Sequence, residues 1–349
     1  MSTARPALRG GLFALAAAIL FGASTPLVQR YGAGAGSFWV AALLYAGAAV
    51  IGVMTLRPAA REARLKAADM PRLALMAAVG AALAPVLLVW GLAQTSGVSA
   101  SLLLTLEAVF TVLLARVFYG EQMDRRVVAA MLLLTGGGAL LVLDQTHAAG
   151  DMRALGALAV LGATAAWGLD NSLSRALSAR DPAQVVFGKS LLGALATAGL
   201  AAALGLAPPH AVAALGLLAT GAIGYGLSLR LYLLAQREFG AARTASVFAF
   251  APFIGAAVAL ALGERGASAW LAAGALLMLA GVLLHLMERH AHAHVHEALE
   301  HEHAHTHGDG HHLHSHDPLP AAAHSHRHRH EPIAHSHPHV PDLHHLHRH

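Results

Sequence analysis

The sequence predicts an all-α membrane protein with ten transmembrane helices, arranged as two inverted five-helix repeats, followed by a disordered His-rich C-terminal tail. Three observations lead to this prediction: the composition, the number of apolar segments and an internal repeat. Of the 349 residues, 56% are hydrophobic and only 12% are charged, whereas a soluble domain carries about 25% charged residues. The charged residues gather in short clusters and in the tail, which is typical of a chain that crosses a membrane many times.

Ten apolar segments have the length of a transmembrane helix, which is roughly 20 residues. Helices are expected because lipid cannot satisfy open backbone groups, and the alternating pattern of a barrel strand is absent from the sequence. The segments that we expect to span the membrane are 10–29, 36–56, 72–95, 98–118, 125–143, 153–174, 183–204, 211–235, 242–262 and 267–287.

The first segment also resembles a secretory signal peptide, because Arg5 and Arg9 precede its apolar run. We favour a helix that stays in the protein. Its residues Ile19–Gly22 resemble Ala165–Gly168, which stand at the same point of the second half of the chain.

The internal repeat is carried by residues 97–141, which match residues 240–284 without a gap at 12 of 45 positions. Many of the identical residues are Ala or Leu, so the glycines and the acidic turns are the informative matches. These are Gly97 with Gly240, Gly138 with Gly281, and Gly120-Glu121 with Gly263-Glu264. The match indicates a duplication. We therefore expect repeats at 1–145 and 146–288 and a tail at 289–349.

The charge of the loops predicts the topology. With the N-terminus inside, the inner segments hold 13 Lys and Arg residues and the outer loops hold three. Positive loops face the cytoplasm, so we expect an inner-membrane protein with both termini cytoplasmic. Each repeat has an odd number of helices, so the second repeat enters the bilayer upside down. Inverted repeats of this kind build the two gates of many secondary transporters.

Two stretches resemble a known family. APFIGAAVALALGERGASAWLAAGALLMLAGVLL resembles the fourth and fifth helices of the EamA repeat of the drug/metabolite transporter superfamily, and TLEAVFTVLLARVFYGEQ looks like the same element in the first half. The family often has Pro beside the acidic residue of helix four; here that place is Ala108, while Pro252 is kept in helix nine. The resemblance covers about residues 8–288. It implies a ten-helix secondary transporter, often an exporter of amino acids or other small metabolites.

Glu107 is the first candidate for the functional site, because it lies about ten residues from either end of the fourth segment. A charge at the bilayer centre costs at least about 2.5–3.5 kcal/mol, so it needs a reason. A carboxylate that faces a cavity would carry a proton or bind a substrate amine. A structural carboxylate would hydrogen-bond to a neighbouring helix. We favour the first interpretation.

Asp170, Lys189 and Arg230 come from three consecutive segments and fall at one depth near the cytoplasmic side. Two interpretations stay open. The three residues form one network whose surplus positive charge attracts a substrate carboxylate or phosphate, or the two cations reach the inner interface and Asp170 pairs with one of them.

Four further side chains are candidates for the lining of a solute cavity: Trp90, Gln94, Trp167 and Tyr232. Aromatic residues on membrane helices more often belong to the interface or to helix packing. Glycines in the fifth, seventh and eighth segments, such as Gly137, predict close helix contacts.

Several function classes are excluded or disfavoured. The chain has no Cys, so disulfides and thiolate metal sites are absent. It has no Walker loop, so ATP does not drive it directly. No enzymatic constellation is present in the segments, and the basic residues are explained by topology rather than by nucleic-acid binding. No cofactor is required for the expected activity, and the oligomeric state is left open.

The tail contains 23 His among its 60 residues from His290 onward, in alternating runs. Low apolar content predicts disorder. Imidazole suits Zn, Ni, Co and Cu ions, so we expect the tail to bind transition metals. The candidate ligands are His290, His292, His294, His296, His301, His303, His305, His307, His324, His326, His328 and His330.

Three functional hypotheses follow. The leading one is a secondary transporter that exports a small molecule across the bilayer by alternating access. The second is efflux of divalent transition metals, with the tail as a cytoplasmic collector. The third is a membrane-anchored metal buffer or sensor without transport.

Overall fold

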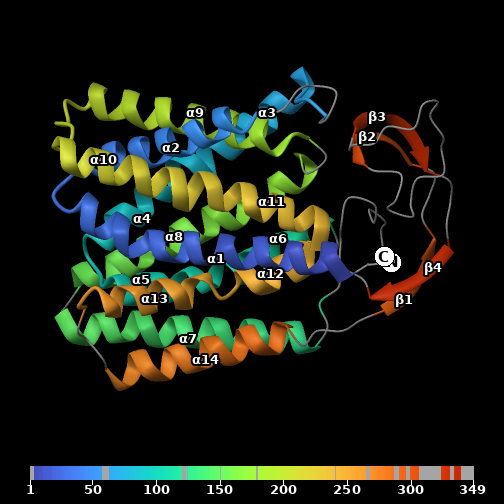
Figure 1. Cartoon of the computed structure of the whole chain (residues 1–349). Helices are drawn as coiled ribbons and strands as arrows, with labels where there is room; N and C mark the ends of the chain where they lie inside the picture. The colour runs from blue at the N-terminus through green and yellow to red at the C-terminus, as the bar shows by residue number, and fades with distance from the viewer. Residues whose placement is uncertain are drawn as a thin grey trace.

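The computed structural model describes residues 4–56, 63–119, 123, 125–149, 151–177, 180–239, 241–264, 268–286, 291–295, 299–305, 324–330 and 334–338. The helices of this part of the chain run roughly along one direction and form a bundle (Figure 1).

Helices of the first half alternate with short turns. They are α1 (Ala4–Gly32), α2 (Ser37–Met54), the 3₁₀ turn η1 (Ala67–Asp69), α3 (Met70–Met76), the π-helical segment η2 (Ala77–Leu83), α4 (Ala84–Leu92), α5 (Gly97–Leu103), the 3₁₀ segment η3 (Leu104–Leu106), α6 (Glu107–Tyr119) and α7 (Arg125–Ala149).

Helices of the second half follow the same order. They are α8 (Asp151–Ser174), the 3₁₀ turn η4 (Arg175–Leu177), α9 (Pro182–Ala203), α10 (Ala211–Thr220), the π-helical segment η5 (Gly221–Leu227), α11 (Ser228–Phe239), α12 (Ala241–Phe248), α13 (Ala251–Ala261) and α14 (Ala269–Leu286).

Eight helical stretches in the described residues are long and apolar enough to cross a membrane. They correspond to the first eight expected segments. The ninth and tenth expected segments contain the shorter apolar helices Ala251–Ala261 and Ala269–Leu284. The ninth expected segment, 242–262, is divided, because α12 ends at Phe248 and α13 begins at Ala251.

Two pairs of matching helices are distorted at matching points. Both the α3–α4 stretch and the α10–α11 stretch contain a seven-residue π-helical segment. Pro85 follows η2 and has no N–H to donate to the carbonyl four residues before it, which favours the wider turn. In the next pair, η3 interrupts the α5–α6 stretch just before Glu107, and a turn interrupts α12–α13 before Pro252. The first interruption forms although Ala108 replaces Pro.

Matching helices of the two halves pack against each other in antiparallel fashion. At one end of the α2–α9 pair the Trp39 indole N–H donates to the Leu206 carbonyl, while further along Gly52 lies against Phe187. In the α7–α14 pair, Asp144 near the end of α7 accepts from Ser268 just before α14. The second half therefore runs opposite to the first.

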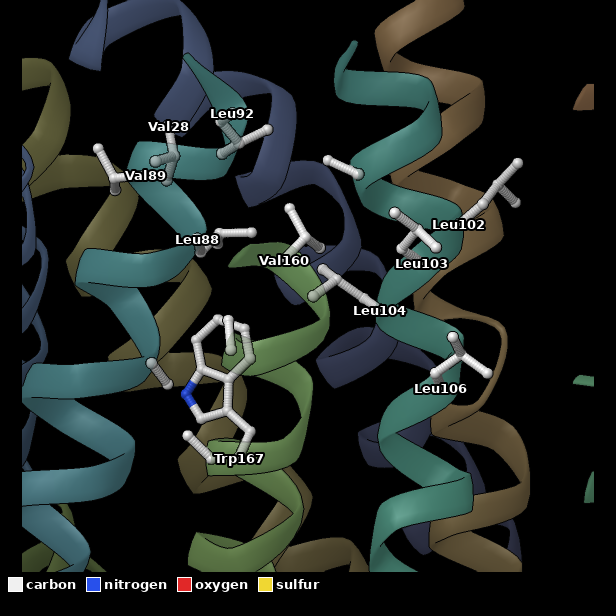
Figure 2. Packing of buried hydrophobic residues seen from close by; sticks show 14 of the residues in the cluster. Val28, Leu88, Val89, Leu92, Leu102, Leu103, Leu104, Leu106, Val160 and Trp167 are labelled. Atoms are coloured by element: carbon white, nitrogen blue, oxygen red, sulfur yellow. The ribbon is translucent and has the colours of Figure 1, made fainter. Parts of the chain in front are cut away.

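The packing also repeats in its partners. Helix α1 packs on α11 and α13, and its counterpart α8 packs on α4 and α6. Leu88 of α4 and Val160 and Trp167 of α8 belong to the central apolar cluster, together with Leu104 of η3 (Figure 2). Helices α1 and α8 therefore hold matching places in the two halves, and each contributes side chains to the central cluster.

The tail differs from the disordered chain that its composition predicts. It contains the strands β1 (Ala291–Val295), β2 (Leu299–His305), β3 (His324–His330) and β4 (Ala334–Pro338). β1 pairs with β4 and β2 pairs with β3, both antiparallel. The alternation of His with smaller or charged residues has the period of a strand, so extended backbones can pair although apolar residues are few.

Candidate functional site

The centre of the bundle holds a buried ion pair between Asp170 of α8 and Lys189 of α9. The side chains are 5% and 6% exposed. A carboxylate and an ammonium in such a place persist only when they are paired. The Asp170 carboxylate fits because residue 80 is glycine: a Cβ there would collide with it. Of the two cations considered from the sequence, Lys189 is the one that pairs with Asp170.

The carbonyl of Gly80 is the second polar feature of this centre. It lies in η2 and accepts two hydrogen bonds, from the Tyr45 hydroxyl at 2.6 Å and from the Trp167 indole N–H at 2.9 Å. Widened π-helical turns often occur at functional sites. Here the turn is surrounded by α2, α8 and the ion pair, so the distorted backbone is part of the polar centre.

Glu107 lies beside this centre, at the first residue of α6. Its carboxylate accepts a hydrogen bond from the Asn171 amide at 2.5 Å. The side chain is half-buried, so it is more accessible than the ion pair. The bond to Asn171, which directly follows Asp170 in α8, places Glu107 beside the ion pair. The central carboxylates and the buried ammonium therefore form one charged group.

An aromatic cluster lies next to the charged group. The Phe21 ring of α1 is 6.1 Å from Trp167, 5.8 Å from Tyr225 and 5.4 Å from Phe248. The Tyr232 ring meets the Phe248 ring edge to face, with the ring centroids 4.9 Å apart. Edge-to-face pairs at these distances stabilise packed aromatic groups, and the tyrosines bring hydroxyls into the apolar cluster.

The other predicted site residues lie elsewhere. Arg230 donates to the Thr55 carbonyl at 3.3 Å, so it contacts the end of α2. Trp90 is 40% exposed and lies on the outside of the bundle, which departs from the expected cavity lining. Gln94 packs against Gly156 of α8.

Sequence reasoning missed three residues of the centre: Asn171, Tyr45 and Tyr225. Asn171 directly follows Asp170 in an apolar helix, and that polar pair was a usable signal. The sequence contains no such signal for the two tyrosines, because each is an isolated aromatic residue in an apolar segment.

Asp170 and Glu107 have no charged counterparts at the positions that match them in the internal repeat. A Cβ at Gly224 of η5 would meet Ser24, just as one at Gly80 would meet Asp170. The serine therefore stands where symmetry would place the aspartate. The residue that matches Glu107 in the internal repeat is Phe250. The distortions of the backbone are therefore repeated, whereas the two carboxylates are replaced by a serine and a phenylalanine at the matching positions.

Three buried polar atoms of this region have no hydrogen-bond partner among the described residues: Asp170 Oδ1, Thr105 Oγ1 and the Tyr225 hydroxyl oxygen. Buried polar groups are nearly always satisfied by protein, water or ligand. Asp170 Oδ1 remains an acceptor although the other oxygen of that carboxylate bonds Lys189.

Comparison with known proteins identifies the family. The model of the EamA-like transporter family matches residues 8–143 and again residues 154–287. The chain belongs to the EamA-like transporter family. Members of this family are transporters rather than enzymes, and the chain is a multi-pass membrane protein.

Two relatives and one solved structure are similar to this EamA protein. A protein of Methanothermobacter thermautotrophicus named "Uncharacterized transporter" is 28% identical over 239 residues, which is 64% of this chain and 66% of the relative. A "Probable terminal-alkyne amino-acid exporter" of Streptantibioticus cattleyicolor is 39% identical over 85 residues, 24% of this chain and 29% of the relative. A crystal structure that is 18% identical aligns with a TM-score of 0.56 over 81% of this chain and 96% of that one, which supports the fold alone.

The metal ligands expected in the tail are placed only at the level of the backbone. His290, His296 and His307 lie outside the described residues. The remaining predicted ligands lie in β1, β2 and β3. Their register sets His301, His303 and His305 opposite His328, His326 and His324. In the part of the chain whose side chains are described, no group of three or more His, Cys, Asp or Glu could hold a metal ion.

Proposed function

We propose that this EamA protein is a secondary active transporter that exports a small metabolite or an amino acid by alternating access. The observation that carries the proposal is the position of Glu107: a half-buried carboxylate, at a helix interruption, held by a neutral amide and next to a buried ion pair. Ionisable groups inside a membrane mark substrate or proton pathways. Interrupted helices mark the binding sites of many transporters.

Each polar group has a role in this proposal. Glu107 carries the coupling proton or binds a substrate amine, because it is the accessible member of the charged group. Asp170 Oδ1 supplies a further acceptor to an ammonium group. Lys189 compensates the charge of Asp170 and contacts a substrate carboxylate when the pair loosens. An amino acid presents both of these groups, and one of the relatives is named as an amino-acid exporter.

The proposed architecture is that of ten membrane helices in two inverted repeats, 1–145 and 146–288. The antiparallel packing of matching helices supports the inversion. We place the protein in the cytoplasmic membrane with both termini inside, as the loop charges predict. The two halves then rock about the charged centre and expose it to one side at a time.

Transport in proteoliposomes with an imposed proton gradient tests the proposal. We expect Glu107→Gln to abolish proton-coupled flux, because the amide cannot carry a proton. Asp144→Asn is the matched control, since Asp144 is also a buried carboxylate but bonds Ser268 at the end of the bundle. Full proton-coupled flux in Glu107→Gln would contradict the coupling role.

A thermal-shift screen against amino acids, nucleosides and metals would identify the substrate class.

Efflux of divalent metal ions is the second candidate function. It is favoured by the register of β2 and β3, which sets three His opposite three His, since cross-strand neighbours lie about 5 Å apart. In this version the tail at 289–349 collects Zn, Ni, Co or Cu ions in the cytoplasm. Deletion of residues 290–349 then lowers growth on nickel, cobalt or zinc, and unchanged tolerance would argue against it. Bound metal without flux in vesicles would instead indicate a buffer or sensor.

A further inference from the structure

The turn between α13 and α14 reaches across to the first half of the chain. The Glu264 carboxylate accepts the backbone N–H of Gly97 at 3.0 Å through Oε1 and that of Val98 at 3.1 Å through Oε2. These are the first two residues of α5. Gly263, at φ +98°, turns the chain so that Glu264 points back to α5; only glycine adopts this backbone easily. A carboxylate at a helix N-terminus is favoured by the unpaired N–H groups and by the helix dipole.

A second side chain holds the same turn from the other direction. Gln29 of α1 donates to the carbonyl of Leu92 at 3.1 Å and to that of Thr95 at 3.2 Å. A Cβ at residue 97 would collide with the ends of both the Gln29 and the Glu264 side chains. Glycine at position 97 is therefore required for the two side chains to close over the α4–α5 turn.

The helices that Glu264 joins are half-helices. α5 ends at η3, and α13 begins after the interruption that follows α12. The two pack closely, since a Cβ at Gly255 of α13 would meet the Ser101 hydroxyl of α5 and the Gly22 carbonyl of α1. α5 and α13 thus form one packed unit, tied by Glu264 at one end and bounded at the other end by the two interruptions beside Glu107.

We propose that Glu264 and the N–H groups of Gly97 and Val98 form a latch that keeps this end of the transporter closed. Opening of the charged centre toward this end requires the latch to release, while the interruptions serve as the hinge. The latch is suited to this role because the Glu264 side chain is half-buried, so water can replace the hydrogen bonds when they break. The inference rests on the alternating-access mechanism proposed above, in which this end faces outward. The sequence match of Glu264 in the first repeat is Glu121, which lies outside the described residues.

The test uses the absence of Cys from the chain. A single Thr105→Cys substitution places a thiol at a buried position of η3, beyond the latch. Spheroplasts that express this protein are treated with a membrane-impermeant maleimide, and the rate of labelling is measured. With the latch intact we expect slow labelling. Glu264→Gln should raise the rate at least about tenfold, because a hydrogen bond to a charged group is lost and the new amide faces a donor.

Two further variants make the result specific. Gly97→Ala should raise the labelling rate in the same way without altering the acid, because its methyl group displaces both holding side chains. Asp144→Asn removes a carboxylate from the same end of the bundle, between α7 and α14, and should label at the parent rate. The latch is overturned if Glu264→Gln labels at the parent rate, or if Asp144→Asn labels as fast as Glu264→Gln. Labelling needs no substrate, so absent flux in the parent would bear on the proposed function and not on the latch.

Discussion

Removing the ammonium of the central ion pair should unfold the protein far more easily than removing both charges. Lys189→Met leaves Asp170 without its cation at a site where the side chains are 5% and 6% exposed. Breaking a buried pair in this way costs about 3–5 kcal/mol, because an uncompensated charge stays behind. The double substitution Asp170→Asn with Lys189→Met leaves no charge, and replacing a whole buried pair is often neutral.

The assay is unfolding by SDS in mixed micelles, followed by circular dichroism, with the free energy of unfolding compared among four proteins: the parent, both single variants and the double variant. We expect the double variant to be more stable than Lys189→Met by about 2 kcal/mol or more, the difference between the unpaired and the neutral site. Two results would refute the assignment of a buried ion pair. One is that Lys189→Met loses less than about 1 kcal/mol in free energy of unfolding. The other is that the double variant loses more than the two single variants lose together.

Four further substitutions test the packing of the helices. Gly137→Ala should lower the free energy of unfolding by about 1–3 kcal/mol, because its methyl group would collide with α14. The added methyl group of Gly136→Ala meets no atom within 4 Å, so this variant should be neutral or slightly stabilising. A thermal melt of both proteins in one detergent compares them. Tyr45→Phe removes one of two hydrogen bonds to the Gly80 carbonyl and should cost about 0.5–1.5 kcal/mol, measured in the same melt; an unchanged melting temperature would contradict that contact. Gly80→Ala places a methyl group on the buried carboxylate and should both destabilise the protein and reduce flux in proteoliposomes; full flux would show that the carboxylate can move away.

The helices were the most predictable part of the fold, because runs of about 20 apolar residues have one stable form in lipid. The common depth of Asp170, Lys189 and Arg230 indicated that they could interact, but it did not select Lys189 as the partner of Asp170. Depth says nothing about rotation about the helix axis, so the sequence left open whether Arg230 joins the pair, and it did not show that Trp90 is 40% exposed. In a segment that is apolar all round, no polar face indicates which side points inward.

The helix interruptions were harder to predict. The break before Pro252 has a residue that explains it, since proline removes a backbone donor. The break before Glu107 has none in its own segment, because Ala108 stands in place of the family's Pro. Its cause is tertiary: the half-helix α5 packs on α13 and on α1, and these contacts depend on residues far away in the chain.

The two repeats share their backbone distortions but not their charged residues, and this has a consequence for how the substrate preference of such a transporter can change. The π-helical segments and the helix interruptions exist in both copies, so they were present before the copies diverged. The ionisable residues at the centre, by contrast, are not shared: Glu107 belongs to the first copy, whereas Asp170 and Lys189 belong to the second. New preferences can therefore arise by exchanging Ser24 or Phe250 for an ionisable residue, with the moving parts left as they are.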